Sequence, residues 1–260
     1  MRLALRQPRS AAGDLARAMA DLRADLATAR AGGADLLLLP ELYFPGYNVA
    51  DMAGGALDAT SPLWSDLSSA VRQAGVALAF GHAEAEGEAG AGRGRLYNSA
   101  TVLSPHGLPL ARYRKVQLYG PREAALFTPG DRLVTFDLMG RRAALLICYD
   151  VEFADHLRTL AHAGVDLVLV PTANMMPYTT VADHLVPAHA AAFGLTIAYA
   201  NLCGVEGDLT YAGGSVVAGP DGAVVAKAGQ GPALLIVDLP DPLPAAARPT
   251  FAGDLRPAGV

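Results

Sequence analysis

Three reactive side chains follow apolar or alternating stretches at separate places in the sequence. Glu41 comes after the run LLLLP, Lys115 lies within RYRKVQLYG, and Cys148 comes after ALLI. Strand ends present side chains to a crevice beside a sheet, so three such ends can bring these residues together. A glutamate and a lysine placed together compensate for each other's burial and can move a proton to and from a thiol. The pattern indicates nucleophilic catalysis by cysteine.

Cys148 considered alone has a simpler interpretation, because a buried thiol usually behaves as a small hydrophobic side chain. Two acids, Asp150 and Glu152, follow it in ICYDVEF. Carboxylates near a thiol would raise its pKa. We therefore expect Asp150 and Glu152 to be acids at the N-terminus of a helix that point away from the sulfur, while that N-terminus favours a thiolate.

Alternating strands and helices must position these residues. Short apolar runs bounded by glycine or proline predict strands, and apolar residues three or four apart predict helices. We read GEAGAGRG as a hairpin loop, because it does not match GxGxxG and precedes a strand. The order indicates a mixed α/β layered fold. The predicted strands are 2–6, 36–39, 76–83, 96–103, 133–137, 142–147, 166–170, 195–201, 215–218, 224–226 and 233–239, and the helices are 11–31, 62–74, 152–163 and 181–193.

The chain length and composition are those of one large α/β domain. The 260 residues are 52% hydrophobic, which can fill a sizeable core. Only 17% are charged, which indicates that some surface is buried against another subunit. We expect a domain at residues 1–240 and a Pro/Ala-rich tail at 241–260, extended on a neighbour or in solvent.

Several classes of partner and location are disfavoured. The net charge of −5 comes from scattered acids, and no basic stripe is present to bind nucleic acid. No apolar run approaches the roughly 20 residues that span a membrane, and MRLALRQ lacks the apolar stretch of a signal peptide. We therefore expect a soluble, cytoplasmic protein with neither a nucleic acid nor a membrane as partner.

Metal sites and disulfides are not expected either. Cys148 and Cys203 have no CxxC spacing and are predicted to be free thiols. The six histidines include no HExxH, and His184 and His189 are five residues apart, which places them on different sides of a helix. We predict no metal and no cofactor.

Three segments carry a resemblance to a known family. PELYFPGYN, RYRKVQLYG and ICYDVEF resemble the motifs of the carbon–nitrogen hydrolase (nitrilase) superfamily, in the order Glu, Lys, Cys. The likeness extends from about residue 2 to residue 239. Two later segments, PTANMMPY and AYANLCG, look most like the aliphatic amidase branch that includes 5-aminopentanamidase.

The resemblance implies a four-layer αββα sandwich that assembles as a homo-oligomer, a dimer or larger. It implies that Glu41 is the general base, Lys115 a positively charged donor and Cys148 the nucleophile. Glu123, in PREAALFTPG, takes the place of a further acid that family members often carry. The alternative for Glu123 is a solvated loop carboxylate.

Physical chemistry supports these roles independently. A thiol with a pKa near 8.5 is mostly protonated at neutral pH, so Glu41 must remove its proton or Lys115 must hold the thiolate. Attack on an amide places negative charge on its oxygen, which Lys115 and the backbone N–H of Tyr149 could stabilise. Glu41 would then protonate the leaving ammonia and activate the water that opens the thioester.

The supporting residues have competing interpretations. Tyr47 and Tyr43 could wall the pocket, although aromatic side chains after a strand more often pack in the core. Asn174 and Met175 lie on a loop expected to face the same crevice, and Asn174 either binds substrate or forms a local turn. Cys203 is expected to be a core thiol.

These observations favour a cofactor-independent amidase that cleaves a small linear carboxamide to carboxylate and ammonia. A nitrilase or an N-carbamoyl amidohydrolase could use the same residues, and a transferase could pass the acyl group to another amine. A catalytically silent assembly protein is the alternative of another class. Gln117 and the pair Ala154–Asp155 depart from the family's usual His and Pro-Glu, which leaves substrate preference open.

Overall fold

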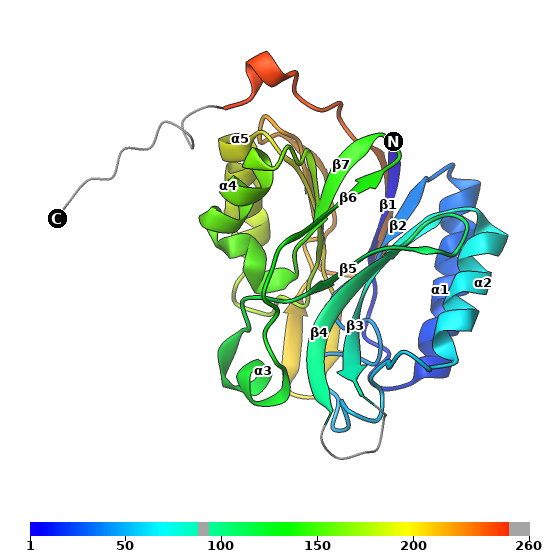
Figure 1. Cartoon of the computed structure of the whole chain (residues 1–260). Helices are drawn as coiled ribbons and strands as arrows, with labels where there is room; N and C mark the ends of the chain where they lie inside the picture. Colours follow the sequence, from blue (N-terminus) through cyan, green and yellow to red (C-terminus); the bar gives the residue numbers. More distant parts are fainter. Residues whose placement is uncertain (88–93, 250–260) are drawn as a thin grey trace.

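Two six-stranded sheets lie face to face, and helices cover the outer side of each, so that four layers are stacked (Figure 1). The structure is a computed structural model that describes residues 1–87 and 94–249. The layers follow the order helix, sheet, sheet, helix, and the predicted αββα sandwich is confirmed.

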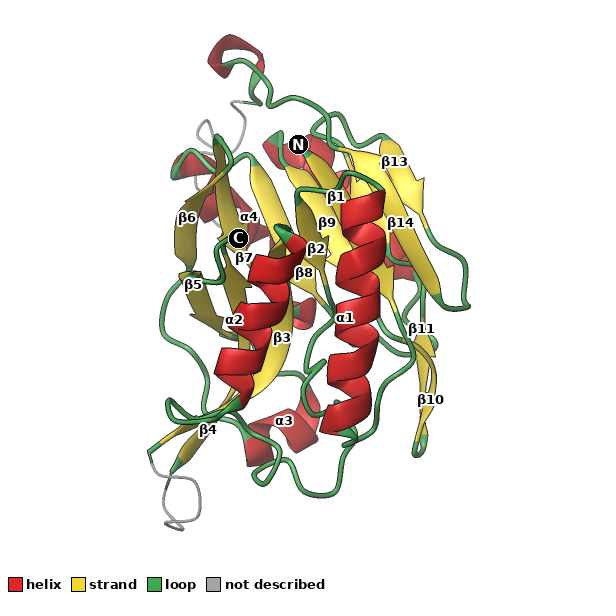
Figure 2. Ribbon diagram, turned by 90° about the vertical axis from the view of Figure 1, so that its right-hand side faces the viewer, coloured by secondary structure: helices red, strands yellow, loops and turns green. Residues whose placement is uncertain are grey.

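The first sheet has the strand order β14-β1-β2-β3-β4-β5. Helices α1 (Leu15–Ala31) and α2 (Leu63–Ala74) lie side by side on its outer face (Figure 2). Asp14 begins α1, because its side chain accepts a hydrogen bond from the Arg17 N–H. The strands are β1 (Arg2–Gln7), β2 (Leu36–Leu38), β3 (Ala77–Glu86), β4 (Arg95–Leu103), β5 (Pro109–Arg114) and β14 (Ala233–Asp238).

The second sheet has the order β13-β12-β9-β8-β7-β6. Its outer face carries α4 (Ala154–His162) and α5 (Val186–Phe193), and a π-helical turn at Val181–Leu185 precedes α5. A small hairpin of β10 (Cys203–Glu206) and β11 (Leu209–Ala212) lies apart from both sheets. The strands of the second sheet are β6 (Val134–Leu138), β7 (Arg141–Leu145), β8 (Leu167–Pro171), β9 (Thr196–Ala200), β12 (Val216–Ala218) and β13 (Val224–Lys227).

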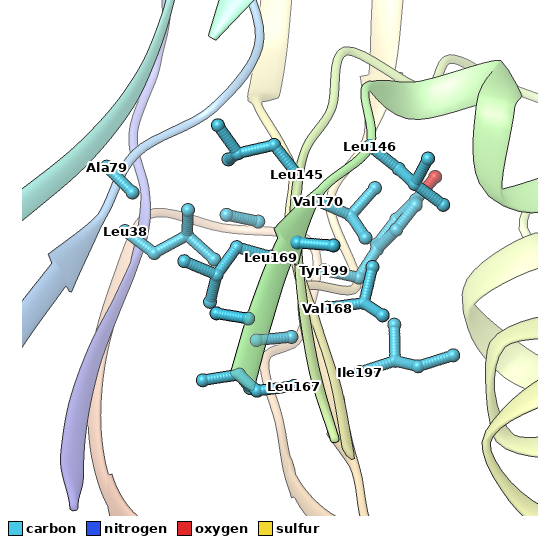
Figure 3. Packing of buried hydrophobic residues seen from close by; sticks show 14 of the residues in the cluster. Leu38, Ala79, Leu145, Leu146, Leu167, Val168, Leu169, Val170, Ile197 and Tyr199 are labelled. Atoms are coloured by element: carbon cyan, nitrogen blue, oxygen red, sulfur yellow. The ribbon is translucent and has the colours of Figure 1, made fainter. Parts of the chain in front are cut away.

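Strand β8 shows how the layers are held together. Leu167 and Leu169 point toward Leu38 in the first sheet, whereas Val168 and Val170 point the other way, toward the helices (Figure 3). The side chains of these four β8 residues and of Leu38 are fully buried. A strand covered on both faces needs apolar residues at every position, which explains the unbroken LVLVP sequence.

The carboxyl ends of several strands meet at one edge of the two sheets. β1, β2 and β3 run parallel to one another, and so do β7, β8 and β9. The Glu41 N–H donates to the Thr172 carbonyl, at 3.3 Å, which joins the segment after β2 to the segment after β8. The segments after β2, β5, β7 and β8 carry Glu41, Lys115, Cys148 and Asn174, respectively.

Several elements were not predicted from the sequence. β5 is an edge strand with exposed residues, so it lacks a clear apolar alternation. The short helix α3 (Gly120–Leu126) and the β10–β11 hairpin were also not assigned. The predicted helix at 152–163 is wrong at its start, because a five-residue 3₁₀ helix, Cys148–Glu152, comes first and α4 begins at Ala154.

Two predicted segments lie largely outside the described residues. In the GEAGAGRG loop, positions 88–93 are not described, but β3 and β4 pair antiparallel as far as Glu86 opposite Arg95, as a hairpin requires. Of the predicted tail at 241–260, residues up to 249 are described. This part contains a short 3₁₀ helix, Ala245–Ala247, and Leu243 and Pro249 lie against Gly194 of the same chain.

Replacement of Leu169 by alanine tests the core between the sheets. Leu169 is fully buried, so Leu169→Ala leaves a cavity and is expected to lower the free energy of unfolding by about 2–5 kcal/mol. Leu108→Ala is the matched control, because Leu108 is 63% exposed and its loss is expected to cost less than about 1 kcal/mol. Urea unfolding measures both, and equal losses would contradict this account of the core.

Candidate active site

Lys115 lies between two carboxylates in the interior of the protein. Its Nζ donates to Glu41 Oε1 at 2.6 Å and to Glu123 Oε1 at 2.9 Å. All three residues are at least 99% buried. One positive and two negative charges leave a net charge of −1, and such a cluster is tolerated in a core only because each charge is paired. The structure thus brings together Glu41, Lys115 and Glu123 as predicted.

The backbone at Glu41 is fixed by a close approach from strand β3. A Cβ on Gly81 would lie 2.5 Å from both the Glu41 Cα and the Leu42 nitrogen, so only glycine fits there. The Gly81 N–H also donates to the Pro40 carbonyl at 3.0 Å. Leu42 has a φ of 46°, in the left-handed region, which turns the chain away from the sheet directly after Glu41.

The two oxygens of Glu41 have different surroundings. Oε1 accepts from Lys115 and from Asn98 Nδ2, the latter at 2.7 Å. Oε2 is buried and has no hydrogen-bond partner among the described residues. Burial raises the pKa of Glu41, and Glu123 adds to this, although Lys115 and Asn98 oppose it. Oε2 is therefore a buried carboxylate oxygen that is available to take a proton.

Glu123 is held from three sides. Besides Lys115, the Tyr47 hydroxyl donates to Oε1 at 2.7 Å, and the Tyr119 N–H donates to Oε2 at 3.0 Å. Glu123 lies on α3, the short helix that follows Tyr119, and is 1% exposed. The alternative of a solvated loop carboxylate is therefore wrong.

The charge of Lys115 is stabilised by its partners. Burial alone would lower the pKa of Lys115, but the charges of Glu41 and Glu123 and the hydrogen bond to Glu41 outweigh it and hold the pKa well above its ordinary value. Lys115 is therefore an ammonium group at neutral pH. A permanent positive charge at this position can stabilise negative charge that develops nearby.

Cys148 has an unusual backbone conformation just beyond β7. Its φ is 46°, and it begins the 3₁₀ helix, so the chain turns sharply at the sulfur. Burial raises the pKa of the Cys148 thiol, as does the charge of Glu41, while Lys115, the Thr172 hydroxyl and the Ala173 N–H act in the opposite direction. The resting residue is a thiol that needs a base.

The expected helix N-terminus at Cys148 requires a correction. The segment is a 3₁₀ helix of only five residues, Cys148–Glu152, and the α-helix α4 begins only at Ala154. A dipole from so short an element is small, because the effect depends on summed, aligned peptide units. Paired charges, rather than a long helix, set the electrostatic environment of Cys148.

Asp150 points away from the sulfur, as predicted. Its oxygens accept from the Tyr113 hydroxyl at 2.8 Å, the Gln117 N–H at 2.8 Å and the Ile147 N–H at 3.0 Å. Asp150 is fully buried. It therefore ties the chain after Lys115 to the turn that carries Cys148.

Glu152 does not behave as a simple helix acid. It is half-buried and lines the same cavity as Cys148, so the prediction that it belongs with Asp150 as an N-terminal helix acid is wrong. A 3₁₀ helix has three residues per turn, which brings Glu152 to a different side from Asp150. Within the described residues, neither carboxylate accepts a hydrogen bond from the Cys148 thiol.

A cavity of about 230 Å³ opens beside the sulfur. Tyr47, Tyr149 and Asn174 line it, as predicted, whereas Tyr43 packs in the core and donates to the Ala18 carbonyl. Asn174 also donates to the Tyr178 carbonyl at 2.8 Å, so the local turn considered for it is present and its side chain lies at the cavity. The complete lining is Tyr47, Tyr119, Cys148, Tyr149, Glu152, Ala173, Asn174, Met175 and Tyr178.

Tyr119 and Tyr178 are two aromatic lining residues that sequence reasoning missed. They form the ends of RYRKVQLY and PTANMMPY, so the segments quoted for the family resemblance already contained them. Their hydroxyls are hydrogen-bonded to each other, which raises the pKa of Tyr119 to about 12. The pair lies at the cavity, where Tyr178 is 48% exposed.

The remaining candidates lie outside this cluster. Cys203 is buried on β10 with its sulfur 3.8 Å from the Gln7 carbonyl, and burial raises the pKa of its thiol.

Within residues 1–87 and 94–249, no group of three or more histidine, cysteine or acidic side chains is arranged to hold a metal. In the same part of the chain, no helix is long and apolar enough to cross a membrane.

Sequence comparisons identify the relatives of this chain. The sequence model of the carbon-nitrogen hydrolase family matches residues 2–248. An (R)-stereoselective amidase from Pseudomonas sp. is 38% identical over 221 residues, which cover 84% of this chain and 78% of that protein. A protein named nitrilase from Pyrococcus abyssi is 33% identical over 205 residues, covering 76% and 73%, respectively.

Comparison with solved structures shows that related amidases share this fold. An amidase from Nesterenkonia sp. superposes with a TM-score of 0.85 at 38% identity, covering 98% of this chain and 93% of that one. A mutant of the amidase from Nesterenkonia sp. AN1 shows Michael addition of acrylamide at its active-site cysteine; its TM-score is 0.83 at 39% identity, with 92% and 93% covered. That amidase is described as belonging to the nitrilase superfamily, so the sandwich is the nitrilase-like fold.

Removal of the Asp150 carboxylate tests its structural role. Asp150→Ala leaves a buried hydroxyl and two backbone N–H groups without their acceptor, so we expect the free energy of unfolding to fall by about 3–5 kcal/mol. Asp155→Ala is the matched control, since the Asp155 side chain is 81% exposed and its ion pair with Arg158 contributes little. Chemical denaturation compares the variants, and similar stabilities would contradict the structural role assigned to Asp150.

Proposed function

Because the chain belongs to the carbon–nitrogen hydrolase family, we propose that it hydrolyses a small linear carboxamide to a carboxylate and ammonia through a thioester on Cys148. The observation that carries this proposal is that Cys148 lines a cavity while its thiol interacts electrostatically with the buried pair of Glu41 and Lys115. The acrylamide adduct on the active-site cysteine of the Nesterenkonia amidase supports the assignment of Cys148 as the nucleophile. The cavity of about 230 Å³ suits a small substrate.

The first half of the reaction forms the thioester. Glu41 Oε2 takes the thiol proton as the Cys148 sulfur attacks the amide carbon. Negative charge then develops on the amide oxygen, where the Lys115 ammonium and the Tyr149 N–H stabilise it. The C–N bond breaks when the leaving nitrogen receives the proton from Glu41, and ammonia departs.

The second half releases the acid. Water enters the site vacated by ammonia and gives a proton to Glu41 as its oxygen attacks the thioester carbon. The C–S bond then breaks, the carboxylic acid leaves and the Cys148 sulfur recovers its proton from Glu41. Because Glu41 takes and returns one proton in each half, the enzyme ends the cycle in its starting state.

Glu123 takes part in this reaction indirectly, by holding the Lys115 side chain in place. Its oxygen holds the lysine Nζ at 2.9 Å, and the hydroxyl of Tyr47 fixes that oxygen in turn. When Glu41 becomes protonated during the reaction, Glu123 remains as the negative partner of the ammonium. Lys115 therefore keeps its position and charge throughout the cycle.

Tyr47, Tyr149 and Asn174 are proposed to contact the substrate, since all three line the cavity. We also propose a cytoplasmic homo-oligomer, on the basis of the low charged fraction of 17% and the absence of an apolar spanning segment from the sequence. The division into a hydrolase domain at 1–240 and a tail at 241–260 is part of the same proposal.

The nucleophile is tested by mass spectrometry. Cys148→Ala is expected to abolish ammonia release from short amides and the acyl adduct that intact-protein mass spectrometry detects after an acid quench. Cys203→Ala is the matched control and should keep nearly all activity, because its thiol lies in the core. An adduct or activity that depends on Cys203 instead would refute the assignment. Product analysis with nitriles and carbamoyl compounds separates the related reactions.

The acid limb of the pH profile tests Glu41. The base must be ionised, and burial raises its pKa, so kcat/KM should fall as pH decreases through a value above that of an ordinary glutamate. Asn98→Ala removes a hydrogen bond to the carboxylate, which should move the limb to higher pH. Glu41→Gln should lower kcat/KM by about 10²–10⁴-fold. An unchanged limb in Asn98→Ala would argue against Glu41 as the titrating base.

A further inference from the structure

Glu206 is a buried carboxylate that the reaction described above does not use. It is the last residue of β10 and is 3% exposed. Its Oε1 accepts from the Ser10 hydroxyl at 2.5 Å, and its Oε2 accepts from the Asn48 N–H at 3.0 Å and from the Tyr211 hydroxyl. Burying a carboxylate is costly, and three neutral donors offset that cost. The carboxylate is therefore fixed in one position.

The segment that Glu206 holds carries Tyr47, a residue of the candidate active site. The Tyr47 hydroxyl donates at 2.7 Å to Glu123 Oε1, the oxygen that also accepts from Lys115 Nζ. Asn48, whose N–H donates to Glu206, is the next residue in the chain. A path of hydrogen bonds and one stretch of backbone thus connects Glu206 with the buried ammonium.

The backbone before Tyr47 also lies close to the Glu206 carboxylate. A Cβ on Gly46 would lie 2.5 Å from Glu206 Oε1, so a side chain there would displace the carboxylate. The φ of Gly46 is 131°, in the region that favours glycine. Glu206 therefore contacts the chain on both sides of Tyr47, at Gly46 and at Asn48.

Helix α3 holds the same segment through a more exposed contact. Arg122, the neighbour of Glu123 on α3, donates to the side-chain oxygen of Asn48 and to the Val49 carbonyl at 3.3 Å. Arg122 is exposed, whereas Glu206 is buried, so water weakens the first contact more than the second. The position of the segment depends mainly on Glu206.

The β10–β11 hairpin also supports a second wall of the cavity. The Met176 N–H donates to the Thr210 carbonyl at 2.8 Å, and the Ala212 N–H donates to the Asn174 carbonyl at 3.0 Å. Both are backbone bonds, and neither uses the Glu206 carboxylate. Loss of that carboxylate would therefore release the wall that carries Tyr47 and leave the wall at Asn174 in place.

We propose that Glu206 is a positioning residue for the reaction. It holds segment 46–48 so that the Tyr47 hydroxyl stays on Glu123. Glu123 in turn keeps the Lys115 ammonium where negative charge develops on the amide oxygen. This inference rests on the proposed function, because it concerns the step in which Lys115 stabilises that oxygen.

Steady-state kinetics of the full-length protein test the inference, with propanamide, butanamide and pentanamide as substrates and ammonia as the product measured. Glu206→Ala removes the acceptor of the Asn48 N–H, so kcat should fall about tenfold, because displacement of a group that acts in the transition state slows the chemical step. KM should change less than about threefold, because the wall at Asn174 stays in place.

Three further variants separate reach, charge and location. Glu206→Gln keeps an oxygen that accepts from the Asn48 N–H and should restore kcat to within about threefold of the wild-type value. Glu206→Asp keeps the charge but is one methylene shorter, so it should lose kcat as Glu206→Ala does, and it replaces that variant if the alanine protein does not fold. Asp208→Asn, at an exposed position of the same hairpin, is the matched control and should leave kcat unchanged.

A double variant tests whether Glu206 acts through Tyr47. Tyr47→Phe removes the hydroxyl that donates to Glu123, so it should lower kcat by about the same factor as Glu206→Ala. If the two residues act in one path, Glu206→Ala added to Tyr47→Phe should lower kcat less than about twofold further. Independent effects would multiply instead.

The outcomes separate this inference from the function on which it rests. With an active wild-type protein, four results would overturn the positioning role and leave the amidase intact: unchanged kcat in Glu206→Ala, a rise in KM alone, equal losses in Glu206→Gln and Glu206→Ala, or multiplied losses in the double variant. Absence of ammonia and of an adduct on Cys148 with every amide would overturn the proposed function and this inference with it.

Discussion

The architecture of the site depends on the buried ammonium of Lys115. A lone charge at this depth would be unstable, and two carboxylates from distant segments, Glu41 after β2 and Glu123 on α3, make it acceptable. The three side chains come from different parts of the chain, so the cluster forms only when the first sheet and the loop beyond β5 are in place. Catalytic geometry and tertiary structure are therefore coupled through one set of ion pairs.

The second sheet brings Cys148, the proposed nucleophile, to this cluster. Strands β7 and β8 end at the same edge as β2, and Asp150 joins the turn at Cys148 to the segment after Lys115. The thiol stays protonated until a base acts, because burial and a nearby carboxylate outweigh the lysine. In the proposed mechanism, the sulfur loses its proton only when Glu41 and an amide are aligned with it.

Much of this arrangement can be read from the sequence, for physical reasons. Continuous apolar runs such as LLLLP and LVLVP belong to strands buried on both faces, and the polar residues that follow them lie at the sheet edge. Short exposed elements such as β5 and α3 leave no such pattern. The orientation of Glu152 could not be predicted, because it depends on whether the chain after Cys148 winds as a 3₁₀ or an α-helix.

The close approach of Gly81 to Glu41 has a consequence for the evolution of this fold. Gly81 carries no reactive group and lies on a neighbouring strand, yet a single added methyl group would collide with the backbone of the proposed base. The space between these two strands therefore constrains the residue at position 81 sterically, although that residue takes no part in the chemistry. Sequence divergence in such an enzyme is limited by the shape of its backbone contacts as well as by its chemistry.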